Sequence, residues 1–385
     1  MKQPYFEKIV SFIKEKYPGQ DFIPLHAPVF AGNEKKYLLD TIDSTFVSSV
    51  GAYVKKFEEM LCEITGAKFA IATVNGTNAL HMALIMAGVD RDDEVISQSL
   101  TFIATCNAIS YLGASPVFVD VDKDSLGMSP ISLVNFLKDN TEKRKDGFAY
   151  NIHTGKRIKA CVPMHTFGLP CRIDELVDIC NSYNIAVVED AAESIGSFYK
   201  NKHTGIYGLL GVFSFNGNKT ITCGAGGAIV TNNQQLAEKA KHLTTQAKIP
   251  HAWAFFHDEI GYNYRMPNLN AALACGQLEQ LGKFVERKRN LSESYSLFFR
   301  GLGVDYVSEI ANSHSNYWLN AIVLSDINER DAFLNFSNSL GVMTRPSWEL
   351  MHRLPMFKNN FKVDLSNSEW LSDRIVNIPS SCFKM

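Results

Sequence analysis

The chain contains 385 residues, a length that accommodates two domains or one large domain with a smaller one appended. Lys and Arg number 38 against 40 Asp and Glu, a net charge of −2, which excludes a nucleic-acid partner held by bulk positive charge. Hydrophobic residues make up 46% and charged residues 20%, and no uninterrupted apolar run is long enough to cross a bilayer. We therefore expect a cytoplasmic protein with no membrane partner.

The cysteine and histidine patterns predict free thiols and no metal site. The eight cysteines stand singly within apolar stretches, without a CxxC pair, and the ten histidines contain no HExxH motif. Isolated cysteines of this kind are usually buried. Neither a disulfide framework nor a bound metal is expected.

The first elements in chain order are helices. Apolar side chains at helical spacing between residues 6 and 13 predict an amphipathic helix, and we assign residues 1–33 to an N-terminal helix and arm. A second helix is expected over 52–65, followed by an apolar strand over 69–74 and an apolar helix over 78–89. This order is typical of the beginning of an α/β domain.

Strand patterns then recur, with helical stretches between most of them, at 94–98, 116–119, 158–163, 185–189, 211–215 and 227–231. Such alternation predicts a mainly parallel sheet with helices on both faces, which we assign to a large α/β domain over residues 34–255. Only a short loop separates the last two strands. Because open α/β sheets bind ligands at the carboxyl ends of their strands, we expect a ligand site at this break.

The pattern changes after residue 260. Helical segments come first, followed by a strand candidate at 317–324 and a helix near 328–340. We predict a smaller α+β domain over residues 256–385, joined to the large domain through a long helix. No repeat or low-complexity linker separates the two parts, so we expect them to pack closely.

Two glycine-containing segments do not fit common nucleotide-binding motifs. Gly224-Ala225-Gly226-Gly227 lacks GxGxxG spacing and precedes a strand, which argues against a dinucleotide-binding fold. The segment Gly217-Asn218-Lys219-Thr220 has the Lys-Thr ending of a phosphate-binding loop, but not its Gly-Lys pair or its upstream glycine. We therefore look for other chemistry at the strand ends.

Four segments with such chemistry follow strands of the predicted sheet. Residues 76–77 (Gly-Thr) stand between a strand and a helix, where backbone amides suit a phosphate group. The run Glu189-Asp190-Ala191-Ala192-Glu193 places acids at the end of an apolar strand. Lys219 follows another strand among neutral and small residues, so its amine is expected to be partly desolvated. Phe102 comes just after a third strand.

Each of these segments alone has a structural explanation: an ordinary turn, a solvated loop, a surface lysine and a core aromatic ring. Together they supply what pyridoxal phosphate requires of a protein. That cofactor needs an amine for a Schiff base, a carboxylate for its ring nitrogen, a phosphate site and a ring to stack on. Their joint occurrence in one sheet predicts this cofactor.

At these residues the sequence resembles the DegT/DnrJ/EryC1/StrS family of nucleotide-sugar aminotransferases, over nearly the whole chain, from Ile23 to Ser381. The resemblance implies a pyridoxal-phosphate-dependent transferase fold of type I, like that of aspartate aminotransferase. Within the family the chain looks most like the LegC-type branch, which aminates UDP-4-keto-6-deoxy-N-acetylglucosamine. The segments that carry this similarity are FAGNE (30–34), VSSVG (47–51), SFNGNK (214–219), LTTQAK (243–248) and GYNYRMPN (261–268).

The resemblance implies roles for individual residues. Lys219 would form the Schiff base and move the proton, and Asp190 would pair with the pyridine nitrogen. Glu193 would contact the pyridoxal hydroxyl, and Asn263 would reach the phosphate of a neighbouring subunit, which implies a homodimer with shared active sites. The full cofactor-binding set is Gly76, Thr77, Phe102, Asp190, Glu193, Ser214, Lys219 and Asn263.

The substrate side is less defined. The chain departs from the family pattern at Ala225, where a glutamate is common, and at Phe46, where many members have tryptophan. Neither departure touches the cofactor chemistry, but both lie in regions that bear on the sugar. The candidates for contacts with the nucleotide sugar, each of which could equally be structural, are Ser48, Ser49, Arg265, Arg345 and Trp348.

The reaction we expect transfers an amino group, with glutamate as the donor, to C4 of a UDP-linked 4-keto-6-deoxy-N-acetylhexosamine for surface glycan biosynthesis. The nearest alternative is the same chemistry on a GDP- or dTDP-linked 4-keto-6-deoxy sugar. A sister group of sugar dehydratases has histidine at the lysine position, so Lys219 favours transamination. A protein that binds the cofactor as a non-catalytic sensor is a further alternative, which no DNA-binding segment supports.

Overall fold

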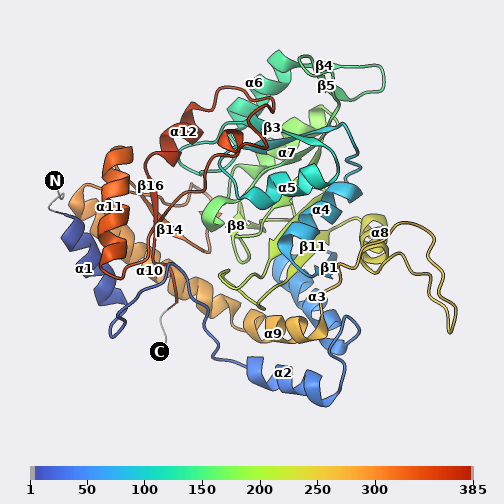
Figure 1. The fold of residues 1–385 in the computed structure, drawn as a ribbon, viewed down its shortest axis with the longest axis horizontal. Helices are drawn as coiled ribbons and strands as arrows, with labels where there is room; N and C mark the ends of the chain where they lie inside the picture. Colours follow the sequence, from blue (N-terminus) through green and yellow to red (C-terminus); the bar gives the residue numbers. More distant parts are fainter. Residues whose placement is uncertain (1–4, 383–385) are drawn as a thin grey trace.

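The computed structural model describes residues 5–382. Its centre is a seven-stranded sheet (Figure 1) built from β1 (Phe69–Thr73), β2 (Glu94–Gln98), β3 (Ser115–Val119), β6 (Ile158–Val162), β7 (Ala186–Asp190), β10 (Leu210–Ser214) and β11 (Gly227–Thr231). The strand order is β1-β11-β10-β7-β6-β2-β3. Only β11 is reversed, antiparallel to β1 and β10, and the other neighbouring pairs are parallel. This is the mainly parallel sheet that the sequence predicted.

Helices cover both faces of this sheet because side chains on successive strand residues point to opposite faces. Ile71, Val188 and Ile229 pack on one face, against α4 (Gly76–Met86), α5 (Ile103–Tyr111) and α8 (Gln234–Thr244). The neighbouring residues Ala72, Val187 and Val230 pack on the other face. The helices of that face are α3 (Ala52–Thr65), α6 (Pro130–Asn140), α7 (Ile173–Ser182) and α9 (Asn268–Leu278).

The smaller unit is built on the long helix α10 (Leu281–Leu302) and an antiparallel sheet. Its strands, in sheet order, are β12 (Asp305–Tyr306), β14 (Asn320–Val323), β16 (Ile375–Ile378) and β15 (Arg345–Pro346). Helices α1 (Phe6–Lys16) and α11 (Ile327–Ser339) pack on it, and the chain passes through α12 (Ser366–Ser372) before its last strand. Phe6 and Ile9 of α1 lie in one buried cluster with Tyr295 and Phe333.

Two helices lie in units other than those predicted for their residues. Helix α9 falls in the range predicted for the smaller domain, but Ala271, Ala274 and Cys275 pack with Phe57 and Leu61 of α3 in the large unit. Helix α1, predicted as a separate N-terminal element, packs into the core of the smaller unit. Both placements depend on contacts between segments far apart in the chain, which local hydrophobic patterns do not specify.

The remaining elements are short or peripheral. Helix α2 (Glu34–Asp43) packs beside α9, and the eight cysteines are free. No helix within residues 5–382 is both long and apolar enough to cross a membrane. The short strands and 3₁₀ helices are β4 (Thr141–Lys143), β5 (Ala149–Asn151), β8 (Phe198–Tyr199), β9 (Lys202–His203), β13 (Ser313–His314), η1 (Thr166–Gly168) and η2 (Met351–Arg353).

Candidate active site

A cavity of about 250 Å³ lies where β1, β7 and β10 end and β11 begins. The antiparallel turn from β10 to β11 is the break in alternation at which a ligand site was expected, and it carries Lys219. Every predicted cofactor residue except Asn263 borders this cavity. Its lining residues are Asn75, Gly76, Thr77, Leu80, Phe102, Ala104, Met164, Asp190, Ala192, Glu193, Ser214, Asn216, Lys219, Ala225 and Gly226.

One end of the cavity is formed by the N-terminus of α4. Asn75 caps this helix in an extended conformation, and its side chain accepts a hydrogen bond from the Asn78 amide at 2.8 Å. The first amides of a helix have no partner within the helix, and the helix dipole favours an anion there. A Cβ atom on Gly76 would lie 2.8 Å from Ser214 Cβ, so only glycine leaves the helix end and Ser214 this close together. The arrangement fits a phosphate group.

The substitution Gly76→Ala is expected to weaken cofactor binding by about tenfold, because the added methyl group must displace Ser214 from the phosphate site. The measurement is the dissociation constant of pyridoxal phosphate, determined by absorbance titration of the full chain. Gly217→Ala is the matched control, since a Cβ there would meet no atom within 4 Å. Equal affinities of the two variants would contradict this account of the helix end.

The carboxylate of Asp190 ends strand β7 and faces the cavity. It is 2% exposed, and it accepts hydrogen bonds from the Thr105 hydroxyl at 2.6 Å and the Ala192 amide at 3.2 Å. Burial raises the pKa of Asp190, while the hydrogen bond from Thr105 opposes this shift. Two fixed donors leave the carboxylate one orientation toward the cavity, where it can hold a protonated ring nitrogen.

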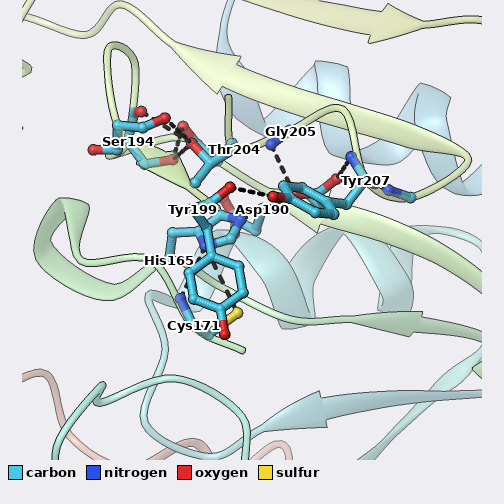
Figure 2. Close-up of polar contacts among 12 residues, drawn as sticks. His165, Cys171, Asp190, Ser194, Tyr199, Thr204, Gly205 and Tyr207 are labelled. Atoms are coloured by element: carbon cyan, nitrogen blue, oxygen red, sulfur yellow. Dashed lines mark hydrogen bonds and ion pairs between the residues drawn. The ribbon is translucent and has the colours of Figure 1, made fainter. Parts of the chain in front are cut away.

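A buried polar network, not found by the sequence analysis, supports the end of β7 (Figure 2). Glu189 points away from Asp190, and its carboxylate accepts hydrogen bonds from the amides of Gly205 and Gly208, both at 2.7 Å. His165 Nε2 lies 3.0 Å from Glu189 Oε2, and the His165 amide donates to the Asp190 carbonyl at 3.1 Å. The network therefore holds the backbone on either side of Asp190. The acid next to Asp190 was visible in the sequence, but no local pattern linked it to His165.

The amine of Lys219 is largely buried, beside a carboxylate that its neutral sequence neighbours do not indicate. Lys219 Nζ donates to Glu193 Oε1 at 3.0 Å, and the side chains are 13% and 1% exposed. Glu193 Oε2 accepts a hydrogen bond from the Phe167 amide at 2.8 Å. Burial raises the pKa of Glu193 to about 7, although Lys219 opposes this shift. Glu193 can therefore take up or release a proton near neutral pH.

Phe102 stands at the mouth of the cavity and remains 46% exposed. Its ring centroid lies 6.0 Å from that of Trp348, which comes from the smaller unit and also packs on Phe167 at 5.1 Å. An exposed ring that borders a polar cavity can stack on a planar cofactor. Together with the helix end, Asp190 and Lys219, it completes a set of residues that fits pyridoxal phosphate.

None of the five predicted substrate residues lines this cavity, although Trp348 packs on Phe102 at its mouth. Ser48 and Ser49 are exposed in the segment after α2, and Arg345 is exposed beside Asn338 and the Thr344 carbonyl. Arg265 is 8% exposed, and its Nη1 donates to Glu58 Oε1 at 2.7 Å and to the Ala72 carbonyl at 3.3 Å. Of the two roles left open for Arg265, the buried ion pair supports the structural one.

The buried pair predicts that Arg265→Met lowers the free energy of unfolding by about 3 kcal/mol, since Glu58 would lose its main counter-charge. Urea denaturation of the full chain measures this change. Arg345→Met is the control, and its exposed side chain should contribute less than about 0.5 kcal/mol. Equal stabilities of Arg265→Met and the wild type would show that the pair has no structural role.

The family model for the "DegT/DnrJ/EryC1/StrS aminotransferase family" matches residues 29–382. The chain belongs to this family. It is 37% identical to the GDP-perosamine synthase of Escherichia coli O157:H7 over 359 residues, covering 93% of each chain. It is 36% identical to the GDP-perosamine synthase of Vibrio cholerae, covering 93% of this chain and 94% of that protein.

Solved structures of aminotransferases share the fold. A DegT/DnrJ/EryC1/StrS aminotransferase from Brucella abortus superposes with a TM-score of 0.81 at 26% identity, covering 90% of both chains. The Helicobacter pylori aminotransferase PseC superposes with a TM-score of 0.84 at 23% identity, covering 93% of both chains. The predicted type I aminotransferase fold is confirmed, as is the class of enzyme. As a member of the family, the chain is a pyridoxal-phosphate-dependent sugar aminotransferase.

Proposed function

We propose that this enzyme transfers an amino group from an amino acid, with glutamate as the donor, to C4 of a GDP-linked 4-keto-6-deoxy sugar. The observation that carries the proposal is the cavity in which Lys219, Asp190 and the N-terminus of α4 meet. Support for the GDP-linked sugar comes from the similarity to two GDP-perosamine synthases along 93% of the chain. That similarity favours the alternative we named over the UDP-linked sugar expected from local segments.

The residues of the cavity divide the work of such a transfer. The cofactor, when bound, provides an aromatic system that accepts the electrons of a broken C–H bond. Asp190 would hold the proton on the ring nitrogen, and the first amides of α4 would hold the phosphate. Lys219 would move the proton that leaves one reacting carbon atom and is added to another. Glu193, whose Oε1 lies 3.0 Å from Lys219 Nζ, would take up or return a proton. Glu193 is 3% exposed, so bulk water does not compete for these protons.

A panel of GDP-, UDP- and dTDP-linked 4-keto-6-deoxy sugars, supplied with glutamate, tests the substrate. We expect amination of the GDP-linked sugar, detected by the mass of the product. Turnover of the UDP-linked sugar alone would overturn the GDP proposal in favour of the LegC-type branch. If every sugar and every amino donor failed while the cofactor still bound, the chain would be a sensor and not a transaminase.

We also propose that the enzyme works as a homodimer in which Asn263 enters the partner's site. Asn263 lies outside its own chain's cavity, at the base of the segment between α8 and α9, which projects from the body of the molecule (Figure 1). This segment carries Trp253, Phe255 and Ile260, which are 81–85% exposed. Apolar side chains this exposed are typical of protein interfaces.

The homodimer predicts that Trp253→Ser combined with Phe255→Ser shifts the full chain from dimer to monomer and reduces amino transfer by at least about tenfold. Sedimentation velocity and turnover are measured on the same sample. Ile131, which is 72% exposed on α6, is the control position, substituted as Ile131→Ser. A double variant that remains dimeric would place the interface elsewhere.

A further inference from the structure

The geometry points to Trp318 as a positioning residue for Lys219: its indole face holds the ammonium of the lysine whenever the amine is not bonded to the cofactor. Lys219 Nζ lies 3.8 Å from the centroid of the Trp318 ring. A lysine ammonium over a tryptophan face is attracted by the ring's quadrupole, and the attraction is stronger where water is excluded. Trp318 is 4% exposed. The inference rests on the role proposed for Lys219.

Trp318 has a second contact with the lysine loop. Its indole Nε1–H donates to the Asn218 carbonyl at 2.7 Å, so the ring holds the backbone next to Lys219 as well as its side chain. The lysine must release the cofactor and later act on it again during each cycle. A side chain with four rotatable bonds would lose orientation in that interval, unless a fixed surface holds its end. The ring of Trp318 and the carboxylate of Glu193 provide this surface from two sides.

The segment that carries Trp318 is itself fixed to the same active-site loop as Glu193. Asn316 Nδ2 donates to the carbonyls of Glu193 and Ile195, both at 2.9 Å, and Asn316 Oδ1 accepts from the Trp318 amide at 2.8 Å. Behind the segment, the fully buried Lys288 donates to the Trp318 carbonyl at 3.1 Å. The two groups that contact Lys219 Nζ are therefore held at a constant separation.

This contact joins the two units of the molecule at the reacting amine. Trp318 lies two residues before strand β14 of the smaller unit, whereas Lys219 lies in the large unit between β10 and β11. The orientation of the smaller unit therefore determines where the lysine is held. Trp318 does not line the cavity, so its effect on the reaction passes through Lys219.

The test is the rate at which an amine-reactive reagent labels Lys219 in the full chain without cofactor, followed by mass spectrometry across pH. An ammonium that loses the ring becomes easier to deprotonate. We expect Trp318→Leu to lower the midpoint of the pH profile by about one unit and Trp318→Phe to lower it by less. The charged and titratable groups around Lys219, namely Glu193, Asp190 and His26, are unchanged in these variants.

Trp370→Leu is the matched control, because Lys123 lies 4.2 Å from the Trp370 ring in a similar pair away from the cavity. Its Lys219 profile should equal that of the wild type. A role of Trp318 in packing alone would change the maximum labelling rate and leave the midpoint in place. A wild-type midpoint in Trp318→Leu, or a larger shift in Trp318→Phe than in Trp318→Leu, would overturn the inference.

A second measurement applies if Trp318→Leu does not fold. The tryptophan emission of the wild-type chain should change with pH, and the midpoint of this change should coincide with the midpoint of Lys219 labelling. The variant Lys219→Met should lack this change. Identical pH dependence in both proteins would overturn the inference. Neither measurement uses a sugar substrate. A midpoint shift without turnover of any nucleotide sugar would therefore leave this inference standing and refute only the proposed reaction.

Discussion

Replacing Lys219 with alanine is expected to lower amino transfer by about 10³-fold or more, because the variant has neither the amine that bonds to the cofactor nor the base that moves the proton. The cavity should still accept pyridoxal phosphate, since the N-terminus of α4 and Asp190 are unchanged. Borohydride treatment followed by mass measurement should attach the cofactor to the wild type and not to the variant. Turnover is measured with glutamate and the GDP-linked sugar.

The fold should survive this substitution. Without Lys219, Glu193 can take up a proton in its buried site, because burial already raises its pKa to about 7. Lys55→Ala is the control, since that side chain is 81% exposed and pairs with Glu59 on the same helix. Turnover of Lys219→Ala at even a tenth of the wild-type rate would remove Lys219 from the mechanism.

The large sheet was predictable because its determinants are local. A strand such as the one found at 227–231, as predicted, is a short apolar run that packs on both faces, and the intervening helices have their own periodicity. The unit to which a helix belongs depends instead on its distant partners. In the sequence of helix α9, Ala271 and Cys275 indicate an apolar face. They do not indicate that this face packs against α3.

The candidate site was predictable where strand ends alone determine position. Asp190 and Ser214 each end a strand of the sheet, so their meeting in one cavity follows from the topology. Contacts that join distant segments had no such signal. Trp318 and Asn218 are 100 positions apart, and the ion pair between Arg265 and Glu58 spans 207 positions.

The substitution Asp190→Asn is expected to leave cofactor binding within about tenfold and to lower the exchange of the α-proton of glutamate by about 10²–10³-fold. Asparagine has the same shape as aspartate, and its amide can still pair with the Thr105 hydroxyl and the Ala192 amide. It has no charge with which to keep the ring nitrogen protonated. Exchange is followed by NMR in deuterated water, with the exposed Asp178→Asn as the control. Near-normal exchange would show that another group performs this role.

The same substitution makes a separate prediction about stability. Burial raises the pKa of Asp190, so the folded chain keeps a proton on this carboxyl at pH values where the unfolded chain has lost it. The contribution of Asp190 to stability therefore falls as pH rises from about 4 through the raised pKa, and Asp190→Asn lacks this loss. Urea denaturation without cofactor should show the free energy of unfolding of Asp190→Asn rising relative to that of the wild type as the pH is raised above about 4, while Asp178→Asn shows no such rise. If the difference in stability between Asp190→Asn and the wild type did not change with pH, burial would not disfavour the ionised form of Asp190 in the folded chain. The wild-type site would then hold a carboxylate for the ring nitrogen before the cofactor binds.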